Sequence, residues 1–370
     1  MGRLTRAEQQ EVTRRRVLDA AHREFTERGF RGATVDGIAE RAGLTRGAVY
    51  SNFPGKRGLY FAVLAREAEQ AAPPEGSPAT TPAAALAAFA STWAERLPRS
   101  QGYAYTAPEQ LTSPILSIDL IPEIQSDDRI RRPFAQLIEL DAILLALALE
   151  ALSAPSDLPL HRFLDVASSA LTVLYGATQL SFAAPGFVDP SQIVALCEQL
   201  LRFHPDPEPA PRPYAETPPA HTVDEPWTPR TCFDMVHSVP IRLDGNRTIA
   251  ILGMHRISAV RELLTTDPRP SPATVVLVTG DATGELAPLA RLALADLSRS
   301  LRYAFPAEAL PALQIVLDEP GELASSCGIA PIGDDTEAAV SISNGRITQR
   351  ATGPGALRIP TTVQACAGKA

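Results

Sequence analysis

A run of closely spaced prolines divides this chain of 370 residues into two regions. Between Pro205 and Pro229 a proline stands at nearly every second or third position. Proline fixes one backbone dihedral angle and has no amide hydrogen, so this density prevents both a helix and a central β-strand. We therefore expect an extended, proline-rich linker over residues 205–235, with folded regions before and after it.

The length and composition indicate a soluble protein with two or three domains. Hydrophobic residues make up 45% of the chain and charged residues 21%, values that differ from those of disordered, fibrous or membrane proteins. The longest apolar run, Ala142–Leu149, is too short to span a bilayer, and the arginine-rich start resembles no secretory signal. We expect a cytoplasmic protein with no membrane partner.

The net charge of −8 is unevenly distributed. Residues 1–66 carry a surplus of +6, so the remainder carries −14. A basic head on an acidic body is typical of a DNA-binding protein, because attraction to phosphate needs only a local positive face. The alternative is a solvated helix surface that happens to be rich in arginine.

The cysteines and the catalytic motifs give no indication of an enzyme. No pair of cysteines has the spacing of a disulfide framework, a redox motif or a zinc site. We find no nucleophile elbow, zinc-protease motif or phosphate-binding glycine loop. We therefore predict no cofactor and no metal. The four cysteines are Cys197, Cys232, Cys327 and Cys366.

Local signals predict four helices near the N-terminus. Thr34 and Thr45 are residues that cap free helix amides, and Gly43 is a residue that ends helices. Apolar residues recur at helical intervals before Gly29, which we expect to stop the first helix. The predicted helices are Ala7–Arg28, Val35–Ala42, Thr45–Tyr50 and Lys56–Gln70.

The second and third of these helices have the pattern of a helix-turn-helix. Two short helices that cross steeply need a small residue at the crossing and a permissive residue at the turn, and Ala39 and Gly43 meet those needs. Ile38, Leu44 and Val49 supply apolar faces that can lock the helices together. The alternative is an ordinary helical hairpin within a core.

This stretch, with its flanks, resembles the TetR family over residues 8–66. The resemblance lies in Gly29-Phe30, Thr34-Val35, Val49-Tyr50-Ser51-Asn52-Phe53 and Lys56. It implies that Thr34, Tyr50 and Lys56 contact phosphate, and that Thr45 and Arg46 lie at base edges or the adjoining backbone. Arg46 is the candidate for reading guanine, whose O6 and N7 atoms match a planar guanidinium. The alternatives are a plain helix cap for Thr34 and a packing role for Tyr50. The candidate DNA-binding residues are Thr34, Thr45, Arg46, Ala48, Tyr50, Ser51, Asn52 and Lys56.

Residues 67–204 are predicted to form an all-α region for ligand binding and dimerisation. The predicted helices are Ala83–Leu97, Ile130–Leu152, His161–Phe182 and Pro190–Phe203. The resemblance implies a sensor cavity for a small apolar or amphipathic effector, although core packing is the alternative for each aromatic residue. The candidate ligand-binding residues are Trp93, Tyr103, Phe134, Phe163 and Tyr175, with Tyr105 and Phe182 as further aromatic candidates.

The resemblance also implies a homodimer built by the last two of these helices. A dimer doubles the few base pairs that one short helix reads, so we expect a double-stranded DNA operator with an inverted repeat. The apolar positions that could form either core or interface are Leu164, Leu171, Leu174, Ile193, Leu196 and Leu200.

Residues 236–370 are predicted to form a smaller α/β accessory domain with a partly parallel sheet, because apolar strands alternate with helices. The expected strands are Thr248–Leu252, Thr274–Thr279, Leu313–Leu317 and Ala338–Ile342, and the expected helices are Ile257–Leu264 and Glu285–Tyr303.

The spacing of this region also resembles a thioredoxin-like domain, through Asp318-Glu-Pro-Gly-Glu-Leu-Ala ahead of Cys327-Gly-Ile. The nucleophilic cysteine pair of that family is absent near Ser258–Val260, and Asp335-Thr336 stands at the position of its cis-proline. We therefore expect a buried, unreactive Cys327 and a non-catalytic domain.

Taken together, the sequence predicts a multi-domain, ligand-responsive transcriptional repressor. The alternatives are a thiol peroxidase or disulfide reductase fused to a DNA-binding head, and a C-terminal module that docks another protein.

Overall fold

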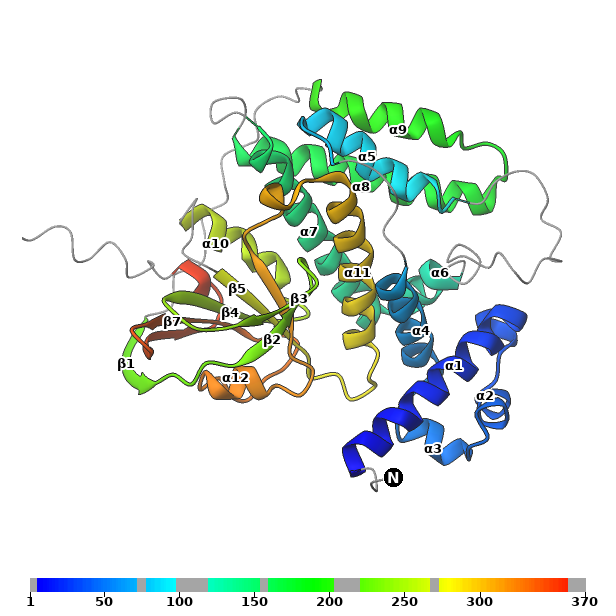
Figure 1. Cartoon of the computed structure of the whole chain (residues 1–370), viewed down its shortest axis with the longest axis horizontal. Helices are drawn as coiled ribbons and strands as arrows, with labels where there is room; N and C mark the ends of the chain where they lie inside the picture. The colour runs from blue at the N-terminus through cyan, green and yellow to red at the C-terminus, as the bar shows by residue number, and fades with distance from the viewer. Residues whose placement is uncertain are drawn as a thin grey trace, which may run out of the picture.

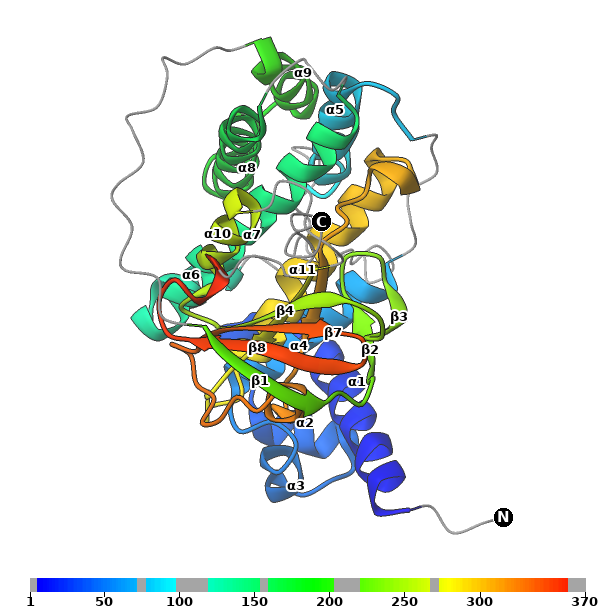
Figure 2. The same cartoon turned by 90° about the vertical axis from the view of Figure 1, so that its left-hand side faces the viewer.

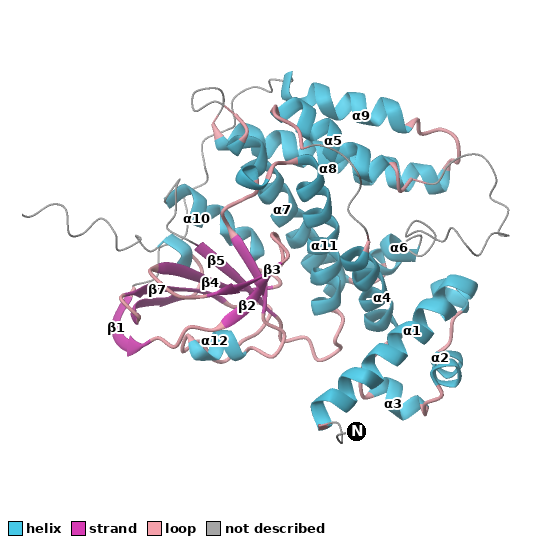
Figure 3. Cartoon of the chain, in the orientation of Figure 1, coloured by secondary structure: helices cyan, strands magenta, loops and turns pink. Residues whose placement is uncertain are grey.

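The computed structural model describes residues 5–71, 78–97, 119–153, 159–202, 220–266 and 273–358. A helical head, a helical body and an α/β region follow one another along the chain (Figure 1). Figure 3 shows that the strands are confined to one side of the molecule, away from the head and from the outermost body helices.

The head consists of four helices. Their bounds agree closely with the predicted ones, because threonine caps and glycine stops act locally. Gly29 has a positive φ of 65°, so the first helix is interrupted at the predicted stop and continues for one short turn. The helices are α1 (Arg6–Gly32), α2 (Val35–Ala42), α3 (Arg46–Tyr50) and α4 (Lys56–Gln70).

The body contains the four predicted helices and one more. The short helix α6 lies where the sequence predicted an irregular, proline-interrupted stretch, of which residues 102–118 are outside the described residues. The body helices are α5 (Pro82–Ala94), α6 (Leu120–Gln125), α7 (Asp128–Ala151), α8 (Leu160–Ala183) and α9 (Pro190–Gln199), the last followed by a 3₁₀ turn over Leu200–Arg202.

The α/β region has a six-stranded mixed sheet with the order β1-β8-β7-β4-β5-β6. Strands β4, β5 and β6 are parallel, and β7, β8 and β1 continue the sheet in antiparallel pairs, so the predicted partly parallel sheet is confirmed. Every residue of β4 and β5 is buried, which explains their continuous apolar runs. The strands are β1 (His221–Pro226), β4 (Arg247–Gly253), β5 (Ala273–Val278), β6 (Gln314–Leu317), β7 (Glu337–Ser343) and β8 (Arg346–Thr352).

Strand β1 corrects the prediction of an extended linker over residues 205–235. Residues 203–219 lie outside the described residues, but His221–Pro226 joins the sheet and pairs with β8. A separate antiparallel hairpin, β2 (Thr231–Asp234) with β3 (Val239–Arg242), follows at once. Prolines exclude a central strand but tolerate a sheet edge, where β1 lies (Figure 2).

Helix α11 (Leu286–Ala304) joins the α/β region to the head and body. It follows β5 in the chain, yet packs against α4, α5 and α7 (Figure 1). Leu64 of α4, Leu144 of α7 and Leu289 of α11 belong to one continuous cluster of buried side chains. The body and the α/β region therefore share a hydrophobic core, whereas the sequence predicted an accessory domain beyond a linker.

The remaining helices are short and flank the sheet. Helix α10 (Val260–Thr266) follows β4, and α12 (Glu322–Ser326) follows β6 on the sheet face opposite α11 (Figure 1). Within the described ranges, no helix is both long and apolar enough to cross a membrane.

Candidate nucleic-acid interface

Three local features fix the ends of α2 and α3 and the turn between them. The hydroxyl of Thr34 accepts a hydrogen bond from the Gly37 amide at 3.0 Å, and the hydroxyl of Thr45 accepts one from the Ala48 amide at 3.2 Å. Gly43 has a φ of 61° and closes α2 in the left-handed region. Because this conformation is costly for residues with a Cβ atom, glycine is favoured there. The turn that the sequence predicted is confirmed.

Helix α3 presents one face to the core and the other to solvent. Val49 is 1% exposed and packs in the same cluster as Ile38 of α2. Thr45 and Arg46 are exposed, and 38% of the Tyr50 surface is accessible. The predicted outward face of α3 therefore lies on the surface, as a helix that enters a DNA groove requires.

Arg46 lies across the outer surface of α3. Its guanidinium carbon is 5.5 Å from the centre of the Tyr50 ring, and its nitrogen atoms lie 3.4 Å from the Tyr50 hydroxyl and 3.5 Å from a carboxylate oxygen of Asp36. The hydrogen bond with Tyr50 and the Asp36 charge raise the pKa of Arg46. The cation at the start of α3 thus has a carboxylate neighbour on α2.

Two other predicted contact residues are engaged at the end of α3. The Ser51 hydroxyl donates to the Ala48 carbonyl at 3.0 Å, and the Asn52 amide donates to the same oxygen at 2.9 Å. Asn52 is half-buried, as is Ala48. These side chains satisfy the carbonyl that the short helix leaves unpaired.

Lys56 holds the head together from the first residue of α4. Its ammonium donates to the carbonyls of Phe30 at 2.8 Å and Ala33 at 3.1 Å, and lies 4.4 Å from the centre of the Phe30 ring. Cations at the end of a helix stabilise its free carbonyls. Two of the three ammonium donors of Lys56 are therefore used to fix α4 against the end of α1.

Two arginines on α1, which are not among the predicted contact residues, also support the interface. Arg14 donates to the Asn52 carbonyl at 3.3 Å, with its guanidinium carbon 4.4 Å from the centre of the Phe53 ring. Arg16 donates to the Ala42 carbonyl at 2.7 Å. The signal was the cluster of arginines beside the apolar stripe of α1, but only the tertiary structure shows which helix end each one meets.

Arg57 ties the head to the rest of the molecule. Its guanidinium donates to Asp127, at the start of α7, at 2.8 Å, and to Glu285, at the start of α11, at 2.6 Å. The hydrogen bond from Arg57 lowers the pKa of Asp127 to about 2. Movement of α7 or α11 would therefore act directly on α4 and the head.

Three of the aromatic ligand candidates are brought together in the body. The Tyr175 ring lies 4.9 Å from the Trp93 ring and 6.0 Å from the Phe134 ring, measured between centroids. Phe163 is fully buried in the core, and Tyr103 and Tyr105 lie outside the described residues. The cavity beside Trp93, Tyr175 and Phe182 measures about 90 Å³, well below the 300–1,000 Å³ that ligand pockets commonly have.

The cysteines of the described ranges are free, and Cys327 is buried as predicted. Burial raises the pKa of Cys327 to about 12 and that of Cys197 to about 11. Since the thiolate is the nucleophilic form, these thiols are poor nucleophiles at neutral pH.

Comparisons with known proteins agree on the head. Residues 17–63 match the family of bacterial regulatory proteins described as the tetR family. The HTH-type transcriptional regulator SrpR of Pseudomonas putida is 52% identical over 65 residues, which cover 18% of this chain and 30% of SrpR. The HTH-type transcriptional repressor AcnR of Corynebacterium glutamicum is 44% identical over 55 residues, which cover 15% of this chain and 29% of AcnR.

These sequence matches span only about a third of the length of the two relatives. Among solved structures, a TetR transcriptional regulator from Rhodococcus sp. RHA1 aligns with 53% of this chain and 97% of its own, at 18% identity and a TM-score of 0.36. The sequence matches and the geometry of α2 and α3 together identify residues 17–63 as an N-terminal helix-turn-helix domain of the tetR family.

Proposed function

We propose that this chain is a DNA-binding transcriptional regulator, and more specifically a ligand-responsive repressor. The observation that carries the proposal is the exposed face of α3, set across α2 by a capped, glycine-closed turn. The basic balance of the first 66 residues supports it, because phosphate attraction supplies most of the non-specific affinity for DNA.

Some residues of the head would contact DNA, and others hold its helices in position. Arg46 reads a guanine edge, while Thr45 and Ala48 lie close to the bases and Thr34 and Tyr50 contact phosphate. Ser51, Asn52 and Lys56 act chiefly by holding α3 and α4 in position, because their donors are engaged within the head.

A homodimer would present two such helices to an inverted-repeat operator. The dimer face that we propose lies on α8 and α9, at the end of the body away from α2 and α3 (Figure 1). Leu180 and Leu196 are each 46% exposed, and Phe187 is 74% exposed, so this face carries apolar surface that the described residues leave uncovered. Leu171 and Leu174 of the predicted set are buried in the core instead.

The regulator would respond to a small apolar or amphipathic effector. An effector shifts the equilibrium only if it binds one conformation better than the other. Arg57 supports such coupling, because it links α4 to both α7 and α11. The name of AcnR as a repressor is consistent with a repressing role, and the cytoplasm is where such a regulator would meet DNA.

The test is selection of bound duplexes from a random pool, followed by gel-shift titration of the recovered site. We expect an inverted repeat, and a loss of affinity of about tenfold or more for Arg46→Ala, since one bidentate contact to guanine discriminates by ~1–3 kcal/mol. Tyr50→Phe should weaken binding less. The control is Arg242→Ala, which removes an exposed arginine of β3. Equal binding of all sequences, or wild-type affinity of Arg46→Ala, would contradict the proposal.

The rival hypothesis, a thiol redox enzyme fused to the head, requires a reactive thiolate. The raised pKa of Cys327 opposes it. Alkylation of the native protein by iodoacetamide at pH 7 distinguishes the regulator from the redox enzyme. A redox cysteine would react within minutes, and its alkylation would abolish peroxide turnover.

A further inference from the structure

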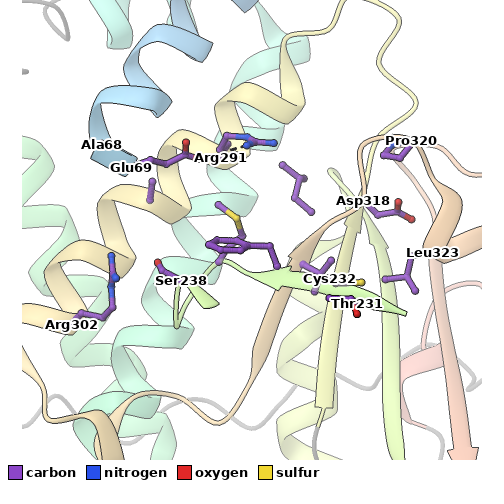
Figure 4. Close-up of a pocket in the computed structure, with 15 residues that line it drawn as sticks. Ala68, Glu69, Thr231, Cys232, Ser238, Arg291, Arg302, Asp318, Pro320 and Leu323 are labelled. Carbon is purple, nitrogen blue, oxygen red and sulfur yellow. Dashed lines mark ion pairs between the residues drawn. The ribbon is translucent and has the colours of Figure 1, made fainter. Parts of the chain in front are cut away.

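A second and larger cavity lies where the head helix α4 meets the α/β region. It measures about 700 Å³, a volume within the range of small-molecule sites. Its walls are the end of α4, one side of α11, the β2–β3 hairpin and the segment from β6 to α12 (Figure 4). Among the described residues, no aromatic ligand candidate of the body lines it.

One part of the cavity wall is apolar. Met235, Ala295 and Leu323 are buried beside it, and half of the Phe233 surface is exposed at the hairpin. A large aromatic side chain left exposed on the wall of a cavity offers a surface on which an apolar ligand can rest.

Most of the charged groups in the cavity already have partners. Arg291 lies 2.6 Å from a carboxylate oxygen of Glu319 and 3.6 Å from one of Glu69. Asp318 accepts a hydrogen bond from the Ala324 amide at 2.9 Å, which caps α12. The charged side chains of Arg291 and Asp318 therefore already have partners within the protein.

Arg302 is the exception among the described lining residues. Its Nε donates to the Ser298 carbonyl at 3.3 Å, but the structure gives the guanidinium no carboxylate partner in the described ranges. The side chain is exposed, although its partial burial lowers the pKa, and no carboxylate of the described residues raises it. Its remaining donors are therefore available to an anion, and Figure 4 shows Arg302 and Arg291 extending from α11 on the same side of the cavity.

The hairpin wall is rigidly held. The buried carboxylate of Asp234 accepts hydrogen bonds from the amides of Val236 at 3.0 Å and Ile315 at 3.2 Å, and pairs with His237 at 2.6 Å. Ser238 has a φ of 55°, a conformation that is uncommon for serine and is found where surrounding structure enforces it. The hairpin wall of the cavity is thus preformed.

We propose that this cavity binds an amphipathic organic anion, with its acid group on Arg302 and its apolar body against Phe233 and Met235. Ala68 and Glu69 at the end of α4 also line the site, so a bound ligand touches the helix whose first turn holds the head through Lys56. The regulatory consequence rests on the proposed function, because the ligand would act on DNA binding through α4.

Binding is tested on the full-length protein without DNA. Calorimetric titration with decanoate, and with decan-1-ol as the neutral probe of equal chain length, separates charge from apolar contact. We expect saturable binding of decanoate to the wild type and affinity about tenfold lower for Arg302→Gln, since a hydrogen bond between two charged groups is stronger than one to a neutral amide. Arg302→Gln should bind decan-1-ol as the wild type does, and Phe233→Ala should weaken both ligands.

The matched control is Arg242→Gln, which removes an exposed arginine from β3 of the same hairpin, outside the cavity lining. It should bind decanoate like the wild type. Absence of saturable decanoate binding to the wild type, or equal affinity of Arg302→Gln and the wild type, would overturn the proposal.

The regulatory step is tested separately by gel shift with a selected duplex. Decanoate should weaken DNA binding by the wild type and not by Arg302→Gln. If decanoate binds but leaves the gel shift unchanged, the regulatory step fails while the ligand site stands. If the protein binds no duplex, the proposed function fails independently of the ligand site.

Discussion

At the scale of single residues, some side chains of the head are free to contact DNA and others hold the helices together, and the motif does not show which. Arg46 and Tyr50 point outward, while Lys56 and Asn52 have their donors bound within the head. The sequence predicts residue types at the right positions. It does not show which side chains are already bonded, because the carbonyls that Lys56 meets lie at the end of another helix and the Asn52 bond depends on where α3 ends.

Asp36 is a residue that should weaken DNA binding. Its carboxylate is 71% exposed and lies beside Arg46, where it opposes the approach of phosphate and competes for the guanidinium. Asp36→Asn should therefore raise affinity for the selected duplex about two- to threefold, since an exposed ion pair is worth only ~0.2–1 kcal/mol. Gel-shift titration at low and moderate salt measures the change.

The control for Asp36→Asn is Glu40→Gln, which removes another exposed carboxylate from the same helix one turn further on. A smaller gain for Glu40→Gln is expected. Equal gains for both variants would mean that only the overall charge of the head matters, and not the pairing of Asp36 with Arg46.

Lys56 should affect the stability of the head even without DNA. Replacement by Met leaves the carbonyls of Phe30 and Ala33 without their donor, at a cost of about 1–3 kcal/mol in the free energy of unfolding. Urea unfolding of the DNA-free protein measures this. Arg46→Met, an exposed substitution, should leave stability almost unchanged, and equal stability of both variants would show that Lys56 is not a structural residue.

At the scale of elements, the sequence predicted the helices and the apolar strands well and missed β1, β2, β3 and β8. Threonine caps and glycine stops define α2 and α3 locally, and continuous apolar runs mark β4 and β5. Strands β1, β2 and β3 have no such run, since their residues are mostly exposed. Strand β8 could have been predicted from Asn344-Gly345, a sequence that favours tight hairpins.

The place of α11 could not be predicted. The apolar pattern predicts that one face of this helix is buried but does not show which elements cover it, and in the structure most of its residues are buried. Packing against α4 and α7 depends on contacts between residues more than 100 positions apart. The same holds for the cavity between α4 and the β2–β3 hairpin, whose lining comes from four separate parts of the chain.

The joint between α4, α7 and α11 should be sensitive to acid. The hydrogen bond from Arg57 depresses the pKa of Asp127 to about 2, from an ordinary value near 4. A depressed folded-state pKa means that the stabilisation is complete above about pH 4 and is lost as the pH falls through about 2. Asp127→Asn should therefore be less stable than the wild type at pH 7, and the difference should shrink between about pH 4 and 2.

Urea unfolding at a series of pH values measures this difference. Asparagine is also a good helix cap, so the start of α7 is preserved in Asp127→Asn. Asp128→Asn, which removes the adjacent and largely exposed carboxylate, is the control and should show a much smaller effect. A stability difference for Asp127→Asn that does not change with pH would contradict the assignment.

At the scale of the whole molecule, the head and the proposed dimer face lie at opposite ends of the body (Figure 1). Helix α4 and its Arg57 contacts connect the two ends through α7 and α11. In a two-fold dimer, a small rotation of each body about the α8–α9 face would change the distance between the two α3 helices. Control of DNA binding then depends on the stability of that face.

The dimer face should be sensitive to a single charge. Leu196→Glu places a carboxylate on exposed apolar surface of α9, where burial against a partner would cost several kcal/mol. We expect a dimer for the wild type and a monomer for Leu196→Glu at micromolar concentration, measured by light scattering with size-exclusion chromatography. Val239→Glu, at an apolar position of similar exposure on β3, should remain dimeric.

The dimer prediction also extends to DNA. Since Leu196 is exposed within the protomer, Leu196→Glu should keep the wild-type circular dichroism spectrum. The variant should lose far more affinity for an inverted repeat than for a single half-site. A dimeric Leu196→Glu would place the interface elsewhere. A wild type that remains monomeric at all concentrations up to 100-fold above the DNA dissociation constant would contradict the proposed dimer. The two heads would then need another way to reach successive major grooves.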